Sequence, residues 1–383
     1  MRDRTFFWAV IAATALLLAG LEWLLYVMDP VGIWGAPIRV GRNQCKIRQE
    51  LFTDIFKPYE YARYRPDILY IGTSKVQAGF AAEEPGSYNF SMPGFPLSDM
   101  REYLRFAYRV HKPKKIYLGL DLISFSQDIY FKRGENAKPS FSEMRLDMIA
   151  MGPLTAHLWA WKDSLPMIKY VPEVWEVSRT QRERPPLHEK GWFRDHGAVT
   201  EVQPEIYYEV FNATNLRTRY YKDFQYAPEA MESLKGILEE AKAAGVEIQL
   251  FFNPMNVDER TVVWLNGHEP KWNWIKEEVA TLQPVYDFDF LNPETLDIRR
   301  NYFDFVHYNR TLGDQVKHVL ATGETEGIAY LLDRENVGRI VREEERAYER
   351  WREENRARVE LLRSWNDGDK PVPMGAFQEF TGF

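Results

Sequence analysis

Two short segments of the sequence carry residue types that together could supply a serine nucleophile and its base. The first is YIGTSKV at residues 70–76, which places Ser74 directly after a short apolar run. The second is NYFDFVH at residues 301–307, in which Asp304 stands three positions before His307. A carboxylate at that spacing can fix the tautomer of the imidazole, and the imidazole can then deprotonate a serine hydroxyl. Among the seven histidines, only His307 has an acidic residue three positions before it.

Each segment alone also fits a simpler interpretation. Ser74 can stand in an ordinary turn at the end of a strand, and Asp304 and His307 can be a chance pair on a surface loop. Together the two segments favour a catalytic interpretation, because active sites in open parallel sheets form at the carboxyl ends of the strands. A serine at that edge can project its hydroxyl into the crevice. The combination therefore predicts a nucleophile and a base that meet in the folded chain.

Short apolar runs and helical segments alternate around both motifs. Five brief apolar runs, bounded by proline, glycine or polar residues, read as strands: 67–71, 87–92, 115–122, 246–252 and 285–290. Four segments read as helices: 97–111, a segment from near Pro228 to before Gly245, 270–282, and 311–321 with Thr311 as its N-cap. This alternation predicts an α/β fold with a mostly parallel, five-stranded sheet covered on both faces.

The N-terminus reads as a membrane anchor. The stretch Phe6–Leu21 contains no charge, and the apolar run resumes after Glu22 and ends at Met28. A helix needs roughly 20 apolar residues to cross a bilayer, so residues 6–28 are long enough. Arg2 and Arg4 precede the run, which puts the N-terminus in the cytoplasm and the main domain outside the inner membrane.

A cleaved signal peptide is the alternative for this segment. The run is longer than the apolar region of a typical signal peptide, and the cleavage-like sequence Ala13-Thr14-Ala15 lies inside it. Leu21 stands where lipoprotein processing would require cysteine. We therefore expect an uncleaved, single-pass anchor with a periplasmic domain. The single cysteine, Cys45, excludes an intramolecular disulfide framework and suits an oxidising compartment.

The composition excludes several other classes of protein. Of the 383 residues, 45% are hydrophobic and 27% are charged, which rules out a disordered chain. The net charge of -7 argues against a broad phosphate-binding surface, so we expect no nucleic-acid partner. No P-loop or dinucleotide fingerprint is present, and the other histidines lack the spacing of metal ligands. We therefore expect no cofactor and no bound metal.

The chain divides by its composition into four segments. Residues 1–29 form the anchor, residues 30–62 an irregular linker, and residues 63–325 the α/β domain. Residues 123–226 within this domain are mixed and rich in aromatics, and read as an insertion. Residues 326–383 form a charged, helical C-terminal tail that either packs against the domain or docks a partner.

In this order and on these elements, the two motifs resemble the SGNH (GDSL-like) hydrolase superfamily over about residues 65–322. In that superfamily the nucleophile follows the first strand, and a C-terminal Asp-x-x-His completes the triad. The resemblance implies a three-layer, flavodoxin-like sandwich with Ser74 as nucleophile, His307 as base and Asp304 as its orienting acid. The short GTS block and the single anchor look like the membrane-tethered O-acyltransferase branch. That branch includes proteins similar to the alginate O-acetylation and lipoteichoic-acid D-alanylation proteins.

The resemblance also implies an oxyanion hole, which this sequence matches only in part. The superfamily's second block contributes a glycine N–H, and Gly94 stands where that glycine is expected, with Gly86 as a rival. The third block usually supplies an asparagine amide, but the aligned residue here is Asp121. An ionised aspartate accepts hydrogen bonds and would repel an oxyanion. Asn253, after the fourth strand, is an alternative amide donor.

Two further residues are candidates for contact with substrate. Asp121 can orient a sugar hydroxyl or serve a structural purpose. Lys75, beside the serine, can attract an anionic substrate or be an ordinary solvated lysine.

These observations lead to a periplasmic, membrane-tethered serine O-acyltransferase or esterase, acting on acyl (foremost acetyl) esters of a cell-surface polysaccharide. Because the periplasm lacks acetyl-CoA, a transferase would need a partner that passes acyl groups across the membrane. The resemblance suggests a polytopic membrane O-acyltransferase as that partner. The alternative is a non-enzymatic subunit that keeps the fold and docks in a membrane protein assembly; Asp121 and the charged tail favour it.

Overall fold

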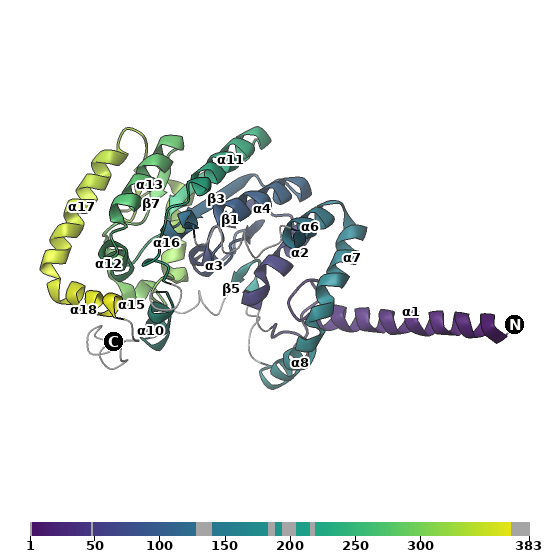
Figure 1. The fold of residues 1–383 in the computed structure, drawn as a ribbon. Coiled ribbons are helices and arrows are strands. Elements are labelled where there is room, and N and C mark those ends of the chain that lie inside the picture. Colours follow the sequence, from purple (N-terminus) through teal and green to yellow (C-terminus); the bar gives the residue numbers. More distant parts are fainter. Residues whose placement is uncertain are drawn as a thin grey trace. The chain divides into compact units, whose positions relative to one another are not determined.

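The computed structural model describes residues 2–46, 49–127, 140–182, 188–193, 204–214 and 219–368 (Figure 1). The chain forms two compact units. The first, called here the anchor unit, combines Met1–Arg65 with Ser140–His188. The second, called here the sheet unit, combines Pro66–Pro139 with Glu189–Phe383. Each unit is described separately below.

The sheet unit is built on a mostly parallel sheet in the order β2-β1-β3-β6-β7-β8. The first five strands run parallel, and β8 is antiparallel to β7. The bounds are β1 Ile68–Ile71, β2 Ser87–Asn89, β3 Lys115–Leu120, β6 Glu247–Phe252, β7 Val285–Asp287 and β8 Tyr330–Leu332. The described sheet thus has six strands, and the prediction of five is wrong. The sixth strand lies in the segment predicted to be a helical tail, where three residues are too few to show a strand period.

The register of the sheet brings the ends of its central strands to one edge. Ile71 on β1 pairs with Leu118 on β3, and Leu120 at the end of β3 pairs with Phe252 at the end of β6. These strands are apolar because neighbouring strands and helices bury them: Leu69, Ile71, Leu118 and Leu250 have no exposed surface. The segments that follow β1, β3 and β6 therefore start from the same edge of the sheet.

Helices of the sheet unit follow these strands. α4 and α11 pack against each other and lie side by side in Figure 1. The helix predicted at residues 311–321 begins one residue earlier, at Arg310, and Asn309 rather than Thr311 caps it by accepting the N–H groups of Thr311 and Leu312. The helices are α3 Ser74–Gly79, α4 Leu97–Val110, η2 Leu122–Phe125, α10 Pro204–Asn212, α11 Pro228–Ala244, α12 Val257–Leu265, α13 Glu269–Leu282, α14 Pro293–Leu296, α15 Ile298–Asn301 and α16 Arg310–Thr322.

The C-terminal helices belong to the sheet unit. α17 (Val337–Glu354) packs on α13, and α18 (Arg356–Asp367) packs on α12. Tyr348 on α17 is fully buried and donates its hydroxyl proton to Thr261 Oγ1 at 2.8 Å. Arg358 on α18 makes two hydrogen bonds to the buried Asp258, at 2.7 and 2.8 Å. The charged segment therefore packs on the sheet unit through buried aromatic residues such as Tyr348 and through the ion pair of Arg358 with Asp258.

The anchor unit consists of helices from two separate parts of the sequence. They are α1 Arg2–Met28, η1 Gln49–Phe52, α2 Thr53–Tyr64, α6 Ser140–Ala150, α7 Pro153–Ser164, η3 Leu165–Tyr170 and α8 Val171–Thr180. The predicted linker, residues 30–62, contains most of α2, which packs on α6 and α7. Buried Asp163 on α7 accepts hydrogen bonds from Tyr59 on α2, at 2.9 Å, and from Arg145 on α6, at 2.6 Å. The predicted insertion, residues 123–226, is accordingly shared between both units.

One helix of the described chain is long and apolar enough to cross a membrane. This helix is Arg4–Met28 within α1; its most apolar 18-residue stretch has a mean hydropathy of 2.0, and only 6% of that stretch is buried. A signal sequence near the N-terminus has the same properties, so length and composition do not fix the topology.

A short hairpin within the predicted insertion lies mostly in the sheet unit, from Glu189 onward. β4 (His188–Glu189) pairs with β5 (Trp192–Phe193). The Lys190 carbonyl accepts the Asn89 N–H of β2 at 2.9 Å, and Trp192 donates its indole N–H to the Ala78 carbonyl of α3 at 2.7 Å. The hairpin therefore supports the short helix that begins at Ser74.

Candidate active site

Ser74 is the first residue of α3, directly beyond the sheet edge. Thr73 is the N-cap of this helix, and its hydroxyl oxygen accepts the Lys75 N–H at 3.4 Å. Gly72 gives the chain room to turn, because a Cβ there would lie 2.5 Å from Val76 Cγ2 and 3.1 Å from the Gly119 carbonyl oxygen. As the first residue of a helix, Ser74 has an N–H with no acceptor within that helix. The GTS sequence thus presents both the Ser74 hydroxyl and its N–H at the end of β1.

Asp304 and His307 form a turn that is closed by the aspartate itself. Asp304 Oδ1 accepts the backbone N–H groups of Val306 and His307, both at 2.8 Å. The other carboxylate oxygen, Oδ2, lies 2.7 Å from His307 Nδ1. Asp304 is buried, and the imidazole stacks on Phe303 at a centroid distance of 5.5 Å. Both carboxylate oxygens are therefore used, one to shape the turn and one to hold the ring.

The structure brings Ser74, His307 and Asp304 together. His307 Nε2 lies 2.8 Å from Ser74 Oγ, although 233 positions separate the two residues in the sequence. An ionised carboxylate only accepts hydrogen bonds, so His307 Nδ1 donates to Asp304 and Nε2 is left to accept the serine proton. The His307 side chain is 19% exposed, so an incoming molecule can reach it. This is the geometry of a nucleophile, a base and an orienting acid.

Two glycines let α3 and α16 approach closely enough to make this contact. A Cβ on Gly79 would lie 1.9 Å from Cε2 of Tyr308, the residue after His307. A Cβ on Gly313 of α16 would lie 1.9 Å from the Gly79 carbonyl oxygen. The Tyr308 hydroxyl is fixed in turn by donating to Asn253 Oδ1 at 2.8 Å. The serine helix and the histidine turn are therefore packed directly on each other.

A buried charged cluster holds the residues on both sides of Ser74. Lys75 Nζ lies 2.9 Å from Glu259 Oε2 on α12 and 3.9 Å from Asp121 Oδ1 at the end of β3. The Thr73 hydroxyl donates to Asp121, and the Tyr221 hydroxyl donates to Glu259. All of these side chains are buried. We call Thr73, Lys75, Asp121, Tyr221 and Glu259 the buried cluster.

The charges of the buried cluster are set by burial and by one another. Burial lowers the pKa of the Lys75 ammonium, but Glu259 and Asp121 more than offset this, so its pKa is raised and it stays charged. Burial raises the pKa of Glu259 to about 7, although Lys75 and Tyr221 oppose the shift. Burial also raises the pKa of Asp121, against the effects of Lys75 and Thr73. Near neutral pH the cluster therefore contains a carboxyl group that can hold or release a proton.

Lys75 and Asp121 do not face solvent. The interpretation of Lys75 as a solvated lysine is wrong, because its side chain is 5% exposed and its ammonium pairs with two carboxylates. Asp121 is 4% exposed. Neither side chain is presented to a substrate in this arrangement, and both hold the Ser74 turn instead.

The two glycines considered for the oxyanion hole lie at different ends of the strands. The Gly86 carbonyl accepts the N–H groups of Asp67 and Ile68, so Gly86 lies at the amino end of β1, away from Ser74. Gly94 follows β2 at its other end, in a left-handed conformation with φ of 54°. Met92 N donates to the Gly72 carbonyl at 3.2 Å, so the segments that lead to Gly94 and Ser74 leave the sheet edge side by side. The geometry favours Gly94 over Gly86.

Asn253 is buried and is bonded to Tyr308, the residue after His307. Its amide nitrogen lies 3.3 Å from the Leu120 carbonyl oxygen, and its carbonyl oxygen accepts the Tyr308 hydroxyl. The amide is thus engaged within the protein, and an oxyanion role for Asn253 remains a prediction that this arrangement does not favour.

Sequence reasoning missed the residues that support the site from a distance. Asn256 caps α12 and donates its amide N–H to the carbonyl of Phe305, next to Asp304, at 2.7 Å. An asparagine before a helical run is a visible capping signal. The partnership of Glu259 and Tyr221 with Lys75 has no such signal, because it joins segments far apart in the sequence.

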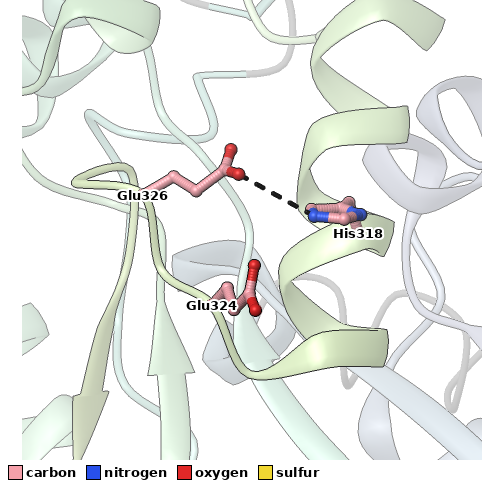
Figure 2. A group of neighbouring side chains, drawn as sticks. All are labelled: His318, Glu324 and Glu326. Atoms are coloured by element: carbon pink, nitrogen blue, oxygen red, sulfur yellow. Dashed lines mark ion pairs between the residues drawn. The ribbon is translucent and has the colours of Figure 1, made fainter.

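A second group of side chains, away from the triad, has the composition of a metal site. His318 on α16 lies near Glu324 and Glu326, which follow that helix (Figure 2). All three are exposed, and His318 Nε2 lies 3.8 Å from Glu326 Oε1. An exposed acidic pair beside a histidine is common without a metal, and the function proposed below does not use this group.

The chain matches no protein-family model and no curated protein. The geometry of the site is therefore the basis for the function proposed below.

Proposed function

We propose that this protein is a serine acyltransferase or esterase that works through an acyl-enzyme. The observation that carries the proposal is the pair of distances at His307, 2.8 Å to Ser74 Oγ and 2.7 Å to Asp304 Oδ2. This arrangement suits the attack of a serine hydroxyl on a carbonyl carbon.

In the proposed reaction, His307 Nε2 takes the Ser74 proton while Oγ forms a bond to the ester carbonyl carbon. The carbonyl oxygen becomes an oxyanion, for which the N–H groups of Ser74 and Gly94 are the proposed donors. Collapse of this intermediate breaks the bond to the leaving alkoxide, which takes the proton from His307, and leaves an acyl group on Ser74. A second hydroxyl, from water or a sugar, then reverses these steps and releases the acyl group. Asp304 holds the imidazole orientation throughout and stabilises its charged form.

We further propose that the sheet unit is a three-layer sandwich of the SGNH, flavodoxin-like type. The order of its five parallel strands supports this, because the first two are exchanged and the rest follow in sequence order. Ser74 after the first strand and the Asp304–His307 turn before the last helix of that core also follow the SGNH pattern.

The proposed substrate is an acyl ester, foremost an acetyl ester, of a cell-surface polysaccharide. This rests on the resemblance of the GTS block and the apolar N-terminal helix to the membrane-tethered O-acyltransferase branch. We place α1 across the bacterial inner membrane, with the N-terminus in the cytoplasm and the remainder in the periplasm. A transferase at that location needs a membrane partner that delivers acyl groups, and a polytopic O-acyltransferase fits that requirement.

Labelling and turnover with the full-length protein test the proposal. A fluorophosphonate should label Ser74, and 4-nitrophenyl acetate should be hydrolysed. The Ser74→Ala variant should lose the label and turn over the ester about 10⁴-fold to 10⁶-fold more slowly. Ser364→Ala, which removes an exposed hydroxyl on α18, is the matched control and should behave as wild type. Unchanged labelling and turnover in Ser74→Ala would rule out the proposed nucleophile.

The same experiment separates the enzyme from a non-enzymatic subunit. A protein that is folded, does not react with the fluorophosphonate and co-purifies with membrane subunits would support the structural role instead.

A further inference from the structure

The anchor unit presents large apolar side chains to solvent along one face of α7. Met151 precedes this helix, and Leu154 and Leu158 lie on it. Their exposed fractions are 72%, 73% and 58%. Leu154 and Leu158 are four residues apart on α7 and therefore lie on the same face of that helix, and Met151 stands just before its first turn. Side chains of this size are usually buried in a soluble unit, so the face calls for an explanation.

One side chain of α7 contacts α1. His157, between Leu154 and Leu158 in sequence, lies with its Nε2 2.7 Å from Oε1 of Glu22 on α1. Its ring also packs edge-to-face on Trp34, at a centroid distance of 5.2 Å. Figure 1 shows α7 running across the direction of α1 at the base of the long helix. If α1 crosses a membrane, the surface of that membrane therefore lies close to α7.

A second segment places apolar side chains beside the same end of α1. Ile38 is 49% exposed and Val40 is 71% exposed. Asn43 ties this loop to α1, because it donates to the Val27 carbonyl at 2.8 Å and accepts the Arg39 N–H at 2.7 Å. Two segments that are far apart in the sequence thus expose apolar side chains beside the last two turns of α1, one held at Glu22 and the other at Val27.

The length of α1 fixes the depth of this point. The uncharged stretch Phe6–Leu21 has 16 residues and spans about 24 Å as a helix. The hydrocarbon core of a bilayer is about 30 Å thick, so its boundary lies about four residues further along, near Leu25. Trp23 and Tyr26 are exposed at this level, as interfacial aromatics are. The Glu22–His157 pair therefore lies within about one helical turn of the boundary between acyl chains and headgroups, and so does the part of α7 around His157.

We propose that Met151, Leu154, Leu158, Ile38 and Val40 form a lipid-docking face that rests in the membrane interface around α1. The inference depends on α1 spanning the bilayer, as proposed above, and is independent of the chemistry at Ser74. Lipid explains why both segments expose apolar side chains. The bilayer surrounds α1, so its surface would contact α7 and the loop of Ile38 and Val40 together. Such a face would fix the orientation of the anchor unit instead of leaving it to swing on a single helix.

The test places a polarity-sensitive fluorophore on this face in the full-length protein. Leu158→Cys is labelled with a nitrobenzoxadiazole reagent and reconstituted in vesicles of phosphatidylcholine and phosphatidylglycerol. Glu343→Cys, at an exposed helical position of the sheet unit, is the matched control. The wild-type chain, whose only cysteine is the buried Cys45, measures background labelling.

The proposal expects blue-shifted emission at position 158 and, with spin-labelled lipid, quenching at least about twofold stronger than at position 343. Quenching of position 158 by aqueous iodide to the same extent as position 343 would overturn it. So would protection from both quenchers, because another protein or a second copy of this chain would then cover the face. Ester turnover and fluorophosphonate labelling are measured in the same samples, so a failure of docking is distinguished from a failure of the proposed chemistry.

Discussion

Asp121 holds Ser74 from both sides, through the Thr73 hydroxyl and the Lys75 ammonium. These two contacts explain why an aspartate, and not an oxyanion donor, stands at this position. A displacement of a reacting atom by about 1 Å can lower the rate about 100-fold. Asp121 is therefore interpreted as a positioning residue.

The substitution Asp121→Asn separates this role from that of a missing oxyanion donor. If Asp121 positions Ser74, the amide weakens the hold on Lys75, and ester turnover should fall about tenfold. If the site lacks an amide donor, the same substitution supplies one, and turnover should rise. Ester turnover and the midpoint of thermal unfolding are both measured. A purely structural defect would lower the midpoint but leave the turnover of the folded protein unchanged. Asp314→Asn, at a half-exposed carboxylate on α16, is the control.

Glu259 makes the stability of the protein depend on pH. Its pKa in the folded chain is about 7, above its ordinary value of 4.5, because burial disfavours the charged form. Between these two values the folded state holds a proton that the unfolded state has released, so stability falls as pH rises. The fall from this group is on the order of 3 kcal/mol.

Urea unfolding at several pH values, with Glu259→Gln beside wild type, measures this contribution. The glutamine has no proton to lose, so the free energy of unfolding of the variant should fall less than that of wild type between pH 4.5 and about 7. Identical slopes for the two proteins over that range would contradict a raised pKa at Glu259.

The contact between α3 and α16 sets the site geometry at the scale of whole elements. Gly79→Ala places a Cβ 1.9 Å from the ring of Tyr308, and that ring cannot yield without moving the His307 turn. We expect a loss of stability of about 1–3 kcal/mol and a larger proportional loss of ester turnover. Gly338→Ala on α17 is the matched control, because its nearest neighbour is the end of an arginine side chain at 3.4 Å. Equal turnover in Gly79→Ala and Gly338→Ala would show that the α3–α16 contact does not hold the site.

Elements with a strong local pattern could be predicted from the sequence, and elements defined by distant partners could not. The apolar runs at β1, β3 and β6 identify central strands because burial on both faces leaves few polar positions, which here are Lys115 in β3 and Glu247 and Gln249 in β6. β8 was missed because it is short and paired only on one side. The helix capped by Asn309 was placed within one residue, but Thr311 was chosen because both residue types are good caps.

The residues of the candidate site also fall into those that a local pattern predicts and those that only tertiary contacts define. Ser74, Asp304 and His307 could be proposed because one follows a strand and the other two have a fixed spacing. The contact of Lys75 with Glu259 joins residues 184 positions apart, and no local pattern records it. The anchor unit was read as a linker and an insertion because its helices are brought together only by tertiary contacts such as those of Asp163.

At the scale of the whole molecule, α1 is both an apolar helix and part of the core of the anchor unit. Leu25 and Met28 in its last turns are buried, although residues 4–20 are exposed. Asp29, directly after α1, accepts the N–H groups of Trp34 and Ala36. An anchor that only tethered the protein would need none of these contacts. The last two turns are therefore expected to be required for folding, whichever way the preceding residues are processed.

Two truncations test this division of α1. Removal of residues 1–21 deletes the exposed apolar stretch but keeps Leu25 and Met28, so the anchor unit should stay folded without a membrane. Removal of residues 1–28 also deletes the two buried side chains, each of which contributes about 1.5–3 kcal/mol on burial, so the anchor unit should unfold at a lower temperature. Hydrogen exchange at α7 and α8 reports on that unit alone, and β1 and β3 of the sheet unit provide the internal control. Equal protection of α7 and α8 in both truncations would mean that α1 contributes only an anchor, whereas fast exchange in the longer deletion alone places the boundary between anchor and fold at Glu22.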